Sequence, residues 1–509
     1  MAYQLNKDIQ RYKPEIDFIE CIKSKDYNKI INSDISNITY NIQNLEDKDF
    51  IFFKNNNLVK FCINNNINFT YKKYEKKLIY YICQYSTPEI IKYIIDIYLE
   101  NNNDLQYDNH IWGPIHSICR YSTPEMIKYI IDIYIDKGYD IQCENIYKWY
   151  PIHYICQYST PEMIKYIIDI YIEKDYDIQC ETNNKKKPIH LICNYSTPEM
   201  IKYIIDIYLE KGYNIQCNDI CKLKPIHFIC QFSTPEIIKY IIDIYLEKDY
   251  DIQCENFNKW QPIHYICEYS TPEMIKYIID IYLEKGYDIQ CKTENKWQPI
   301  HYICKYSTLE MIKYIINIYF EKGYDIQCES NNDYKLKPIH YICGYGAPEI
   351  IKYIINIYIE KGYDLQCETR DKWKPIHYIC QFSTPEMIKY IIDIYLKKDY
   401  DIQCETRNGS KPIHFICQSS TPEIIKYIID IYLKKNYDLQ CKYYDGRKPI
   451  HFICMYSTPE MIKYIIDIYI EKEYNLQSWE NNKIYILSLL QDNSTKEMVN
   501  YYLSKLKRY

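Results

Sequence analysis

The feature that most constrains the fold of this chain is an internal repeat. The hexapeptide Pro-Ile-His-x-Ile-Cys recurs, usually every 37 residues, and begins at Pro114, Pro151, Pro188, Pro225, Pro262, Pro299, Pro338, Pro375, Pro412 and Pro449. A variant begins at Leu78. A unit of this length cannot bury its own apolar faces, so tandem units must stack on one another. The repeat therefore predicts a stacked array rather than separate globular domains.

Only one segment of the repeat changes in length. The count from each Pro to the Cys of Ile-Gln-Cys is constant, whereas the step from that Cys to the next Pro is eight residues in most units and ten before Pro338. The residue types also differ most in this segment. Variation in both length and composition predicts a surface loop.

Each unit carries start signals for two helices. Pro151 suits the first turn of a short helix. Ser159-Thr160-Pro161-Glu162 then supplies an N-cap hydroxyl, a first-turn Pro and an acid, which predicts a second helix. That helix has one narrow polar stripe, formed by Glu162, Lys165, Asp169 and Glu173. Gly138, Asp175 and their counterparts tolerate the left-handed conformation that ends a helix.

These residues resemble the ankyrin repeat. Pro-Ile-His-Tyr-Ile-Cys is similar to the ankyrin pattern Thr-Pro-Leu-His-x-Ala, and the Trp two residues before Pro fits the family's finger loop. The period of 37 exceeds the family's ~33, and the four extra residues fall in the second helix. The Thr before Pro is absent, so its hydroxyl cap is lost. The Ile, Tyr, Asn and Lys bias resembles the ankyrin proteins of giant DNA viruses of amoebae, the mimivirus type.

The resemblance implies an all-α, ankyrin-type helical solenoid of about 12 repeats, with a second helix one turn longer than usual. We expect residues 1–45 to form an N-terminal helical cap segment and residues 46–77 a degenerate short repeat. Residues 78–478 hold eleven ankyrin-like repeats, and residues 479–509 form a C-terminal capping repeat. Ser488 and Gln491 stand at the His and Cys positions of that last unit, as expected for a face that meets water.

The repeated His and Cys could carry chemistry. A His and a Cys one helical turn apart could help to ligate zinc, and such a pair could also act as a nucleophile and base. A catalytic triad needs one distinct cleft, however, whereas this pair recurs in equivalent settings. The resemblance implies a structural role, with the His hydrogen-bonded to the loop between repeats. The structural set is His116, His153, His190, His227, His264, His301, His340, His377, His414 and His451.

Composition limits the partners. The formal net charge of -6 gives no long-range attraction to nucleic acid, and no apolar run is long enough for a membrane span. The first residues carry charges where a secretory peptide needs an apolar core, so we expect a cytoplasmic protein, in the host cell cytoplasm if viral. We expect no enzymatic activity, no cofactor, no metal and a monomer.

Recognition of a protein partner is the predicted function, through the variable loops and the adjoining face of the first helix. The candidate contact residues are Trp112, Trp149, Phe257, Trp260, Trp297, Arg370, Trp373, Arg407, Tyr444 and Arg447. Each Trp could instead clamp its own loop. Three alternatives stay open: a structural or self-associating viral component, a metal-binding His/Cys array, and an adaptor to degradation machinery.

Overall fold

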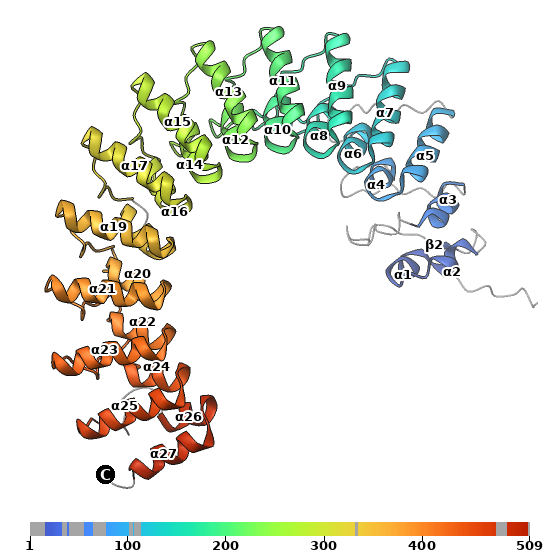
Figure 1. The fold of residues 1–509 in the computed structure, drawn as a ribbon. Helices are drawn as coiled ribbons and strands as arrows, with labels where there is room; N and C mark the ends of the chain where they lie inside the picture. Colours follow the sequence, from blue (N-terminus) through green and yellow to red (C-terminus); the bar gives the residue numbers. More distant parts are fainter. Residues whose placement is uncertain are drawn as a thin grey trace, which may run out of the picture. The chain divides into compact units, whose positions relative to one another are not determined.

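A computed structural model describes residues 16–32, 38–39, 55–64, 78–100, 105, 113–330, 334–474 and 486–506. The chain divides into two compact units, Met1–Ile252 and Gln253–Tyr509. Helix pairs make up most of both units (Figure 1). Trp112, most of segments 1–45 and 46–77, and residues 479–485 lie outside the described residues.

Each repeat contributes one short and one long helix. The first helix has 8 residues and the second 13 or 14 in the repeats that begin with Pro. The first helices are α4 (Leu78–Tyr85), α6 (Pro114–Tyr121), α8 (Pro151–Tyr158), α10 (Pro188–Tyr195), α12 (Pro225–Phe232), α14 (Pro262–Tyr269), α16 (Pro299–Tyr306), α18 (Pro338–Tyr345), α20 (Pro375–Phe382), α22 (Pro412–Ser419), α24 (Pro449–Tyr456) and α26 (Ile486–Asn493). The second helices are α5 (Pro88–Glu100), α7 (Pro124–Asp136), α9 (Pro161–Glu173), α11 (Pro198–Glu210), α13 (Pro235–Glu247), α15 (Pro272–Lys285), α17 (Leu309–Lys322), α19 (Pro348–Lys361), α21 (Pro385–Lys397), α23 (Pro422–Lys434), α25 (Pro459–Glu471) and α27 (Lys496–Leu506).

A short segment comes before the pairs in the first unit. Its elements are β1 (Ile16–Asp17), α1 (Phe18–Lys23), α2 (Tyr27–Ile31), β2 (Ile38–Thr39) and α3 (Asn56–Asn64). β1 pairs with β2 in parallel, α2 contacts α3, and α3 contacts α5. The role of residues 1–45 as a cap stays a prediction.

The local signals in the sequence set the helix ends. Pro151 takes the first position of α8, and the Thr160 hydroxyl accepts a hydrogen bond from the Met163 amide at 3.4 Å at the start of α9. The second helices end near a left-handed residue, such as Asp175 with φ 56° or Gly212 with φ 68°. The predicted helix starts and stops are confirmed at these residues.

The first helices lie at the centre of each stack. All six residues from Pro151 to Cys156 are buried, because α8 packs against α6, α10 and its own second helix α9. Each second helix from α7 to α25 buries a large Tyr completely, as at Tyr171 and Tyr208. The Tyr171 hydroxyl donates to the Ile141 carbonyl of the preceding repeat at 3.1 Å, so the buried polar group is satisfied and two repeats are tied together.

A second set of contacts links the outer sides of the second helices. Tyr203 donates its hydroxyl hydrogen bond to Asp169 of the preceding repeat, and Lys165 Nζ lies 5.5 Å from the centre of the Tyr203 ring. We call this arrangement the Lys-Asp-Tyr ladder. It recurs with Lys202, Asp206 and Tyr240; with Lys276, Asp280 and Tyr314; with Lys389, Asp393 and Tyr427; and with Lys426, Asp430 and Tyr464.

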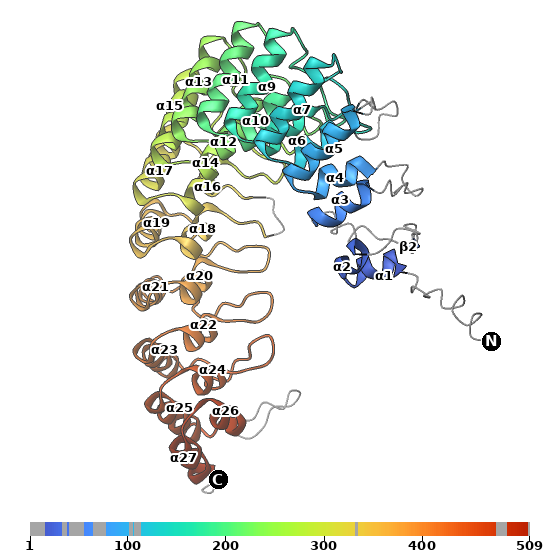
Figure 2. The same cartoon turned by 90° about the vertical axis from the view of Figure 1, so that its right-hand side faces the viewer.

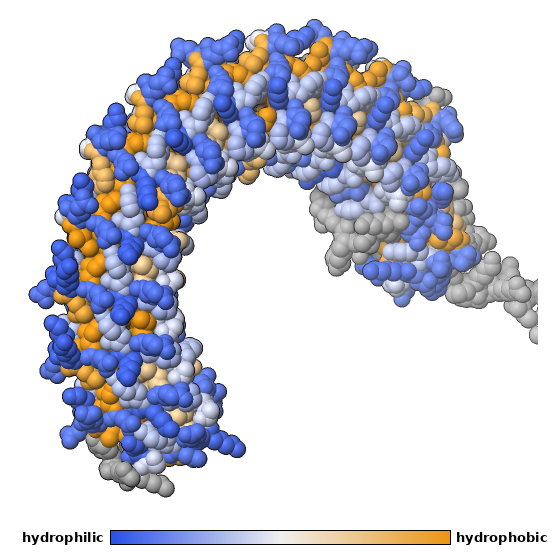
Figure 3. Space-filling view, in the orientation of Figure 1, coloured by the Kyte–Doolittle hydropathy of each residue, from blue (hydrophilic) through white to orange (hydrophobic). Residues whose placement is uncertain are grey.

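The ladder explains part of the polar stripe predicted on the second helix. Two of its four members, Lys165 and Asp169, contact the next repeat, whereas Glu162 and Glu173 are exposed. Hydrophilic patches recur along the stacked repeats on the face drawn in Figure 3. The stripe therefore serves packing between repeats as well as solvation.

Candidate protein-binding surface

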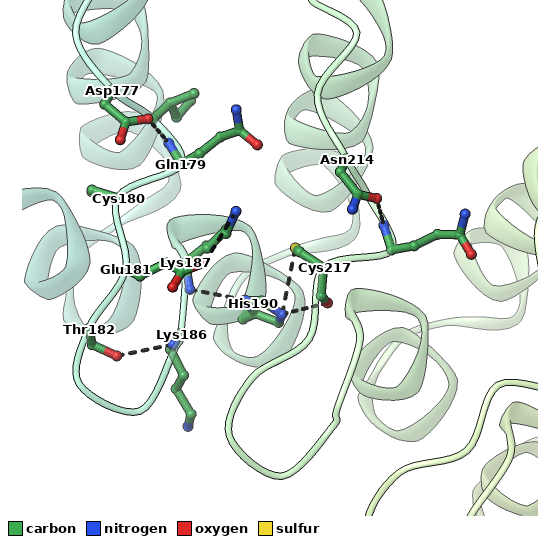
Figure 4. A network of polar contacts seen from close by, with 12 residues as sticks. Asp177, Gln179, Cys180, Glu181, Thr182, Lys186, Lys187, His190, Asn214 and Cys217 are labelled. Carbon is green, nitrogen blue, oxygen red and sulfur yellow. Dashed lines mark hydrogen bonds and ion pairs between the residues drawn. The ribbon is translucent and has the colours of Figure 1, made fainter.

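Each loop from the residue after Ile-Gln-Cys to the residue before Pro forms a tight turn that we call a finger. In the finger 181–187, the Thr182 amide donates to the Lys186 carbonyl at 3.0 Å, and the Thr182 hydroxyl accepts the Lys186 amide at 3.1 Å (Figure 4). In other fingers the residue at the Thr182 position accepts the same hydrogen bond, from the amide four residues later, through its side-chain oxygen. These residues are Asn145, Asp219, Asn256, Thr293, Thr369 and Thr406. One short polar side chain thus fixes the turn, so the tip residues are able to vary.

One residue of each finger that the structure describes is left-handed. Lys185 has φ 56°, and Lys148, Lys222, Lys259, Lys296 and Lys372 have similar angles. A non-glycine residue seldom adopts this conformation. Gly409 and Gly446 occupy the same position in two fingers. Those two glycines are the sequence signal that reveals the turn.

Neighbouring finger tips are joined through their backbones. The Asn183 amide donates to the Tyr147 carbonyl at 3.0 Å in the first unit, and the Arg407 amide donates to the Asp371 carbonyl at 2.7 Å in the second. These bonds involve no side chain, so they hold whichever residues stand at the tips. The fingers of the second unit that precede α20, α22 and α24 project on the side away from the second helices α21 and α23 (Figure 2).

The repeated His fixes the base of each finger. The His190 Nδ1 atom accepts the Lys187 amide at 3.0 Å, so Nε2 carries the proton and donates to the Cys217 carbonyl at 3.0 Å (Figure 4). Burial lowers the pKa of His190 to about 4, which keeps the ring neutral at pH 7. The residue before Pro has no Thr hydroxyl in these repeats, and its backbone amide is hydrogen-bonded to this ring.

These contacts bear on the zinc and nucleophile hypotheses. Both nitrogens of His264 are hydrogen-bonded, to the Gln261 amide and the Cys291 carbonyl. Burial raises the pKa of the Cys267 thiol well above its ordinary value, so the thiolate that attacks or binds metal is disfavoured. No group of three or more His, Cys, Asp or Glu in the described part of the chain is placed to hold a metal ion.

Of the predicted Trp residues, the structure describes Trp149, Trp260, Trp297 and Trp373, which lie at the finger bases and are half-buried. The Tyr302 ring lies between Trp260 and Trp297, with ring centres 5.2 and 4.7 Å away. Trp373 packs in the same manner between Tyr378 and Phe415, at 5.0 and 5.1 Å. Trp149 lies 4.9 Å from Tyr154. The rings of Trp260, Trp297 and Trp373 therefore pack between repeats, and contact of their exposed edges with a partner stays a prediction.

The other predicted contact residues lie at the finger tips. Phe257 and Tyr444 are 67% and 63% exposed. Arg370 is also exposed, and Arg407 pairs with Asp371 of the preceding finger at 3.3 Å. Arg447 differs, because it turns back onto Asp445 of its own finger and onto the Phe452 ring.

A row of exposed aromatic side chains was missed by the sequence analysis. It occupies the last position of the first helix, two residues after the buried Cys. The aromatic row comprises Tyr121, Tyr158, Tyr195 and Phe232 in the first unit and Tyr269, Tyr306, Tyr345, Phe382 and Tyr456 in the second, all 45% to 69% exposed. The signal was available, since the residue just before Ser-Thr-Pro is the last of the first helix, beyond the buried run that ends at Cys156 in α8.

The aromatic row and the finger bases share one surface. Lys305 Nζ lies 5.4 Å from the ring centre of Trp297 in the finger, and 4.6 and 5.7 Å from those of Tyr306 and Tyr345 in the row. In the first unit, Arg120 lies over both Tyr121 and Tyr158. A partner that touches the row therefore also meets the fingers.

Comparison with known proteins agrees with this architecture. The family model for ankyrin repeats, in its form with three copies, matches residues 278–365, 354–437 and 376–478. Residues 278–478 of this protein match the ankyrin-repeat family. The all-α helix pairs form an ankyrin-type solenoid, and ankyrin repeats typically serve as non-enzymatic modules for protein–protein interaction.

Among solved structures, the chain is similar to the crystal structure of the ankyrin repeat domain of Bcl-3, described as a unique member of the IkappaB protein family. The sequence identity is 9% and the TM-score 0.33, over 48% of this chain and 99% of that chain. No curated protein sequence matches. Within the described residues, no helix is long and apolar enough to cross a membrane.

Proposed function

We propose that this protein is a non-enzymatic scaffold that binds a protein partner along its finger tips and aromatic row. The observation that carries the proposal is the aromatic row itself. Monomeric proteins seldom expose a large contiguous apolar patch without a function, and Tyr and Trp are enriched where proteins bind one another.

The finger tips supply the differences that specific binding needs. The tip of the finger 255–261 is Asn256-Phe257-Asn258. The same positions hold Thr369-Arg370-Asp371 in the finger 368–374 and Thr406-Arg407-Asn408 in the finger 405–411. Helix residues near these tips are almost the same in every repeat. A host protein is the partner that the resemblance to giant-virus ankyrin proteins would imply.

Site-specific photo-crosslinking tests the proposal. A photoreactive amino acid is placed at Phe257 in a finger, at Tyr306 in the aromatic row, or at Glu284 on the outer side of α15, and the full chain is illuminated in amoebal lysate. We expect the same partner band from Phe257 and Tyr306, and none from Glu284. Crosslinks from Glu284 alone would place binding on the outer side and contradict the proposal.

A tip exchange then tests specificity. Phe257→Arg with Asn258→Asp gives this finger the tip of 370–371 but keeps Trp260 and its ring contacts. We expect the partner identified by crosslinking to bind about tenfold more weakly, which is about 1.4 kcal/mol. If the crosslinked partner is instead a second copy of this chain, self-association is the function.

A further inference from the structure

Three fingers of the second unit, which precede α20, α22 and α24, are more basic than the two that begin the unit. The fingers 368–374, 405–411 and 442–448 hold eight Lys and Arg against four Asp and Glu, a net charge of +4. The fingers 255–261 and 292–298 hold three against two. Because the whole chain has a net charge of -6, this positive charge is local to the finger edge.

The structure places the cationic groups at different depths. At the finger bases, Lys374 pairs with Glu368 at 3.6 Å and Lys411 pairs with Glu405 at 3.4 Å, so these Lys are neutralised by their own finger. The tips of the first two fingers carry the exposed Arg370 and Arg407 instead. Arg407 is 57% exposed despite its ion pair with Asp371.

The last finger departs from this pattern at its base. Lys442 stands where the two preceding fingers have Glu368 and Glu405, and it is exposed. Lys448 has no acidic partner of that kind in its own finger and donates to Gln440 Oε1 at 3.1 Å. The positive charge of this finger is therefore not balanced at its base.

An apolar surface adjoins these fingers. Phe382 at the end of α20 and Tyr456 at the end of α24 are 60% and 55% exposed, and Ser419 interrupts the row between them. Carboxylates of a partner would therefore meet the fingers while its apolar side chains reach the row.

We propose that the fingers 368–374, 405–411 and 442–448 bind an extended acidic segment of a protein partner, with carboxylates at Arg370, Arg407 and Lys442. Helices of adjacent repeats pack about 10 Å apart, and an extended chain advances about 3.3 Å per residue. Acidic residues at every third position of the segment would then meet successive fingers. This proposal rests on the proposed function and specifies the chemistry of its partner.

A protein segment fits these fingers better than nucleic acid. Asp371 and Asp445 stand at the tips among the cations, where they would repel a continuous phosphate backbone. A peptide can place its carboxylates at the basic side chains and neutral residues beside the two Asp.

Fluorescence anisotropy on the full chain tests the proposal. The probe is a labelled 12-residue peptide with Glu at every third position and Leu and Ser between; the comparison probes replace each Glu with Gln or with Lys. We expect the Glu peptide to bind at least tenfold more tightly than either, with affinity that falls as salt rises. Equal binding of the Gln or Lys peptide, or no binding of the Glu peptide, would overturn the acidic preference.

Charge reversal locates the site. Arg370→Glu with Arg407→Glu should weaken binding of the Glu peptide at least tenfold. The matched control, Lys397→Glu with Lys434→Glu, changes the net charge equally in the same repeats, at positions where α9, α11 and α13 carry Glu. An equal loss in both variants would show a general charge effect and contradict the site.

Two outcomes separate this inference from the proposed function. A dT20 oligonucleotide that binds more tightly than the Glu peptide, and loses affinity in the Arg double variant, would assign the fingers to nucleic acid. Failure of the acidic peptide, together with a protein crosslinked from Phe257 and Tyr306, would leave the scaffold function standing and overturn only the acidic partner.

Discussion

The second helices and the fingers differ in how they connect neighbouring repeats and in how much their residues vary. In the second helices, repeated side chains contact the neighbouring repeat, as Tyr208 does through the Ile178 carbonyl and Tyr203 through Asp169. In the fingers, hydrogen bonds between backbone atoms join neighbouring tips, such as the bond from the Asn183 amide to the Tyr147 carbonyl, and side-chain contacts such as the Arg407–Asp371 ion pair occur in single fingers. The difference explains why helix residues repeat almost unchanged whereas finger tips vary.

Acid should produce the largest loss of stability, because it acts on all the buried His of the framework at once. Burial lowers the pKa of His264 to about 4 and that of His153 to about 3, below the ordinary value of about 6.5. The neutral rings therefore contribute stability above pH ~6.5, and this is lost as the pH falls toward 4, by up to about 3 kcal/mol for each His. Urea unfolding at pH 7 and pH 4.5 measures this loss of stability. A midpoint that does not change with pH would contradict the buried, neutral assignment.

Removal of a buried Tyr should be the most damaging single change. Tyr208→Ala should destabilise its part of the stack by about 3 to 5 kcal/mol, because it leaves a large hole between repeats. Tyr208→Phe should lose about 1 kcal/mol, since only the bond to the Ile178 carbonyl is removed. Hydrogen exchange of the amides in α9 and α11 locates the loss. Tyr195→Ala, at an exposed position of the aromatic row, is the control that should cost little.

Loss of one structural His should have an intermediate effect. His264→Ala leaves the buried Gln261 amide and Cys291 carbonyl without this partner, which should cost about 1 to 3 kcal/mol in urea unfolding. The metal content, measured by mass spectrometry on protein purified without added metal, should not change. Stoichiometric zinc that disappears in this variant would reverse the structural assignment.

The ladder should contribute less, because its groups are partly exposed to water. Tyr203→Phe removes the hydrogen bond to Asp169 but keeps the ring under Lys165, so we expect a loss of about 0.5 kcal/mol. Tyr158→Phe, which lies in the aromatic row, is the matched control with no expected change in the thermal midpoint. A loss above about 2 kcal/mol would show that the ladder is a principal bond between repeats.

A finger tip should contribute least to stability. Phe257→Arg with Asn258→Asp keeps Asn256, Lys259 and Trp260, which set the turn, so the free energy of unfolding should change by less than about 0.5 kcal/mol. Thermal unfolding measures it alongside the binding test. A clearly lower midpoint would mean that tip side chains support the stack, and the contrast between the two regions would be wrong.

Much of the fold could be predicted from the sequence because its signals are local. Pro151, Thr160 and Asp175 set helix ends through contacts within a few residues, and the structure confirms these ends. The pairing of Tyr203 with Asp169 could not be predicted in this way. When every repeat carries the same residues, the sequence does not reveal whether a Tyr contacts an Asp of its own repeat or of the one before.

The candidate surface was predicted only in part. Variable residues such as Phe257 and Tyr444 lie at exposed tips, as expected from their variation. The sequence left open whether each Trp clamps its own finger or stands exposed as an anchor; Trp297 packs between Tyr302 and Tyr341, and contact with a partner stays a prediction. The aromatic row was overlooked because its members repeat as regularly as the core residues, so regularity alone did not separate exposed from buried Tyr.

The ladder also has a consequence for how such a chain can change in length. Most second helices present Lys and Asp to the following repeat and Tyr to the preceding one, so a typical repeat carries both complementary sets of contact residues. Duplication or deletion of a whole 37-residue unit at the level of the gene would create a junction with the same three groups in register. Selection could then act on the number of repeats separately from the identity of each finger, and a binding surface could be lengthened without the redesign of any interface.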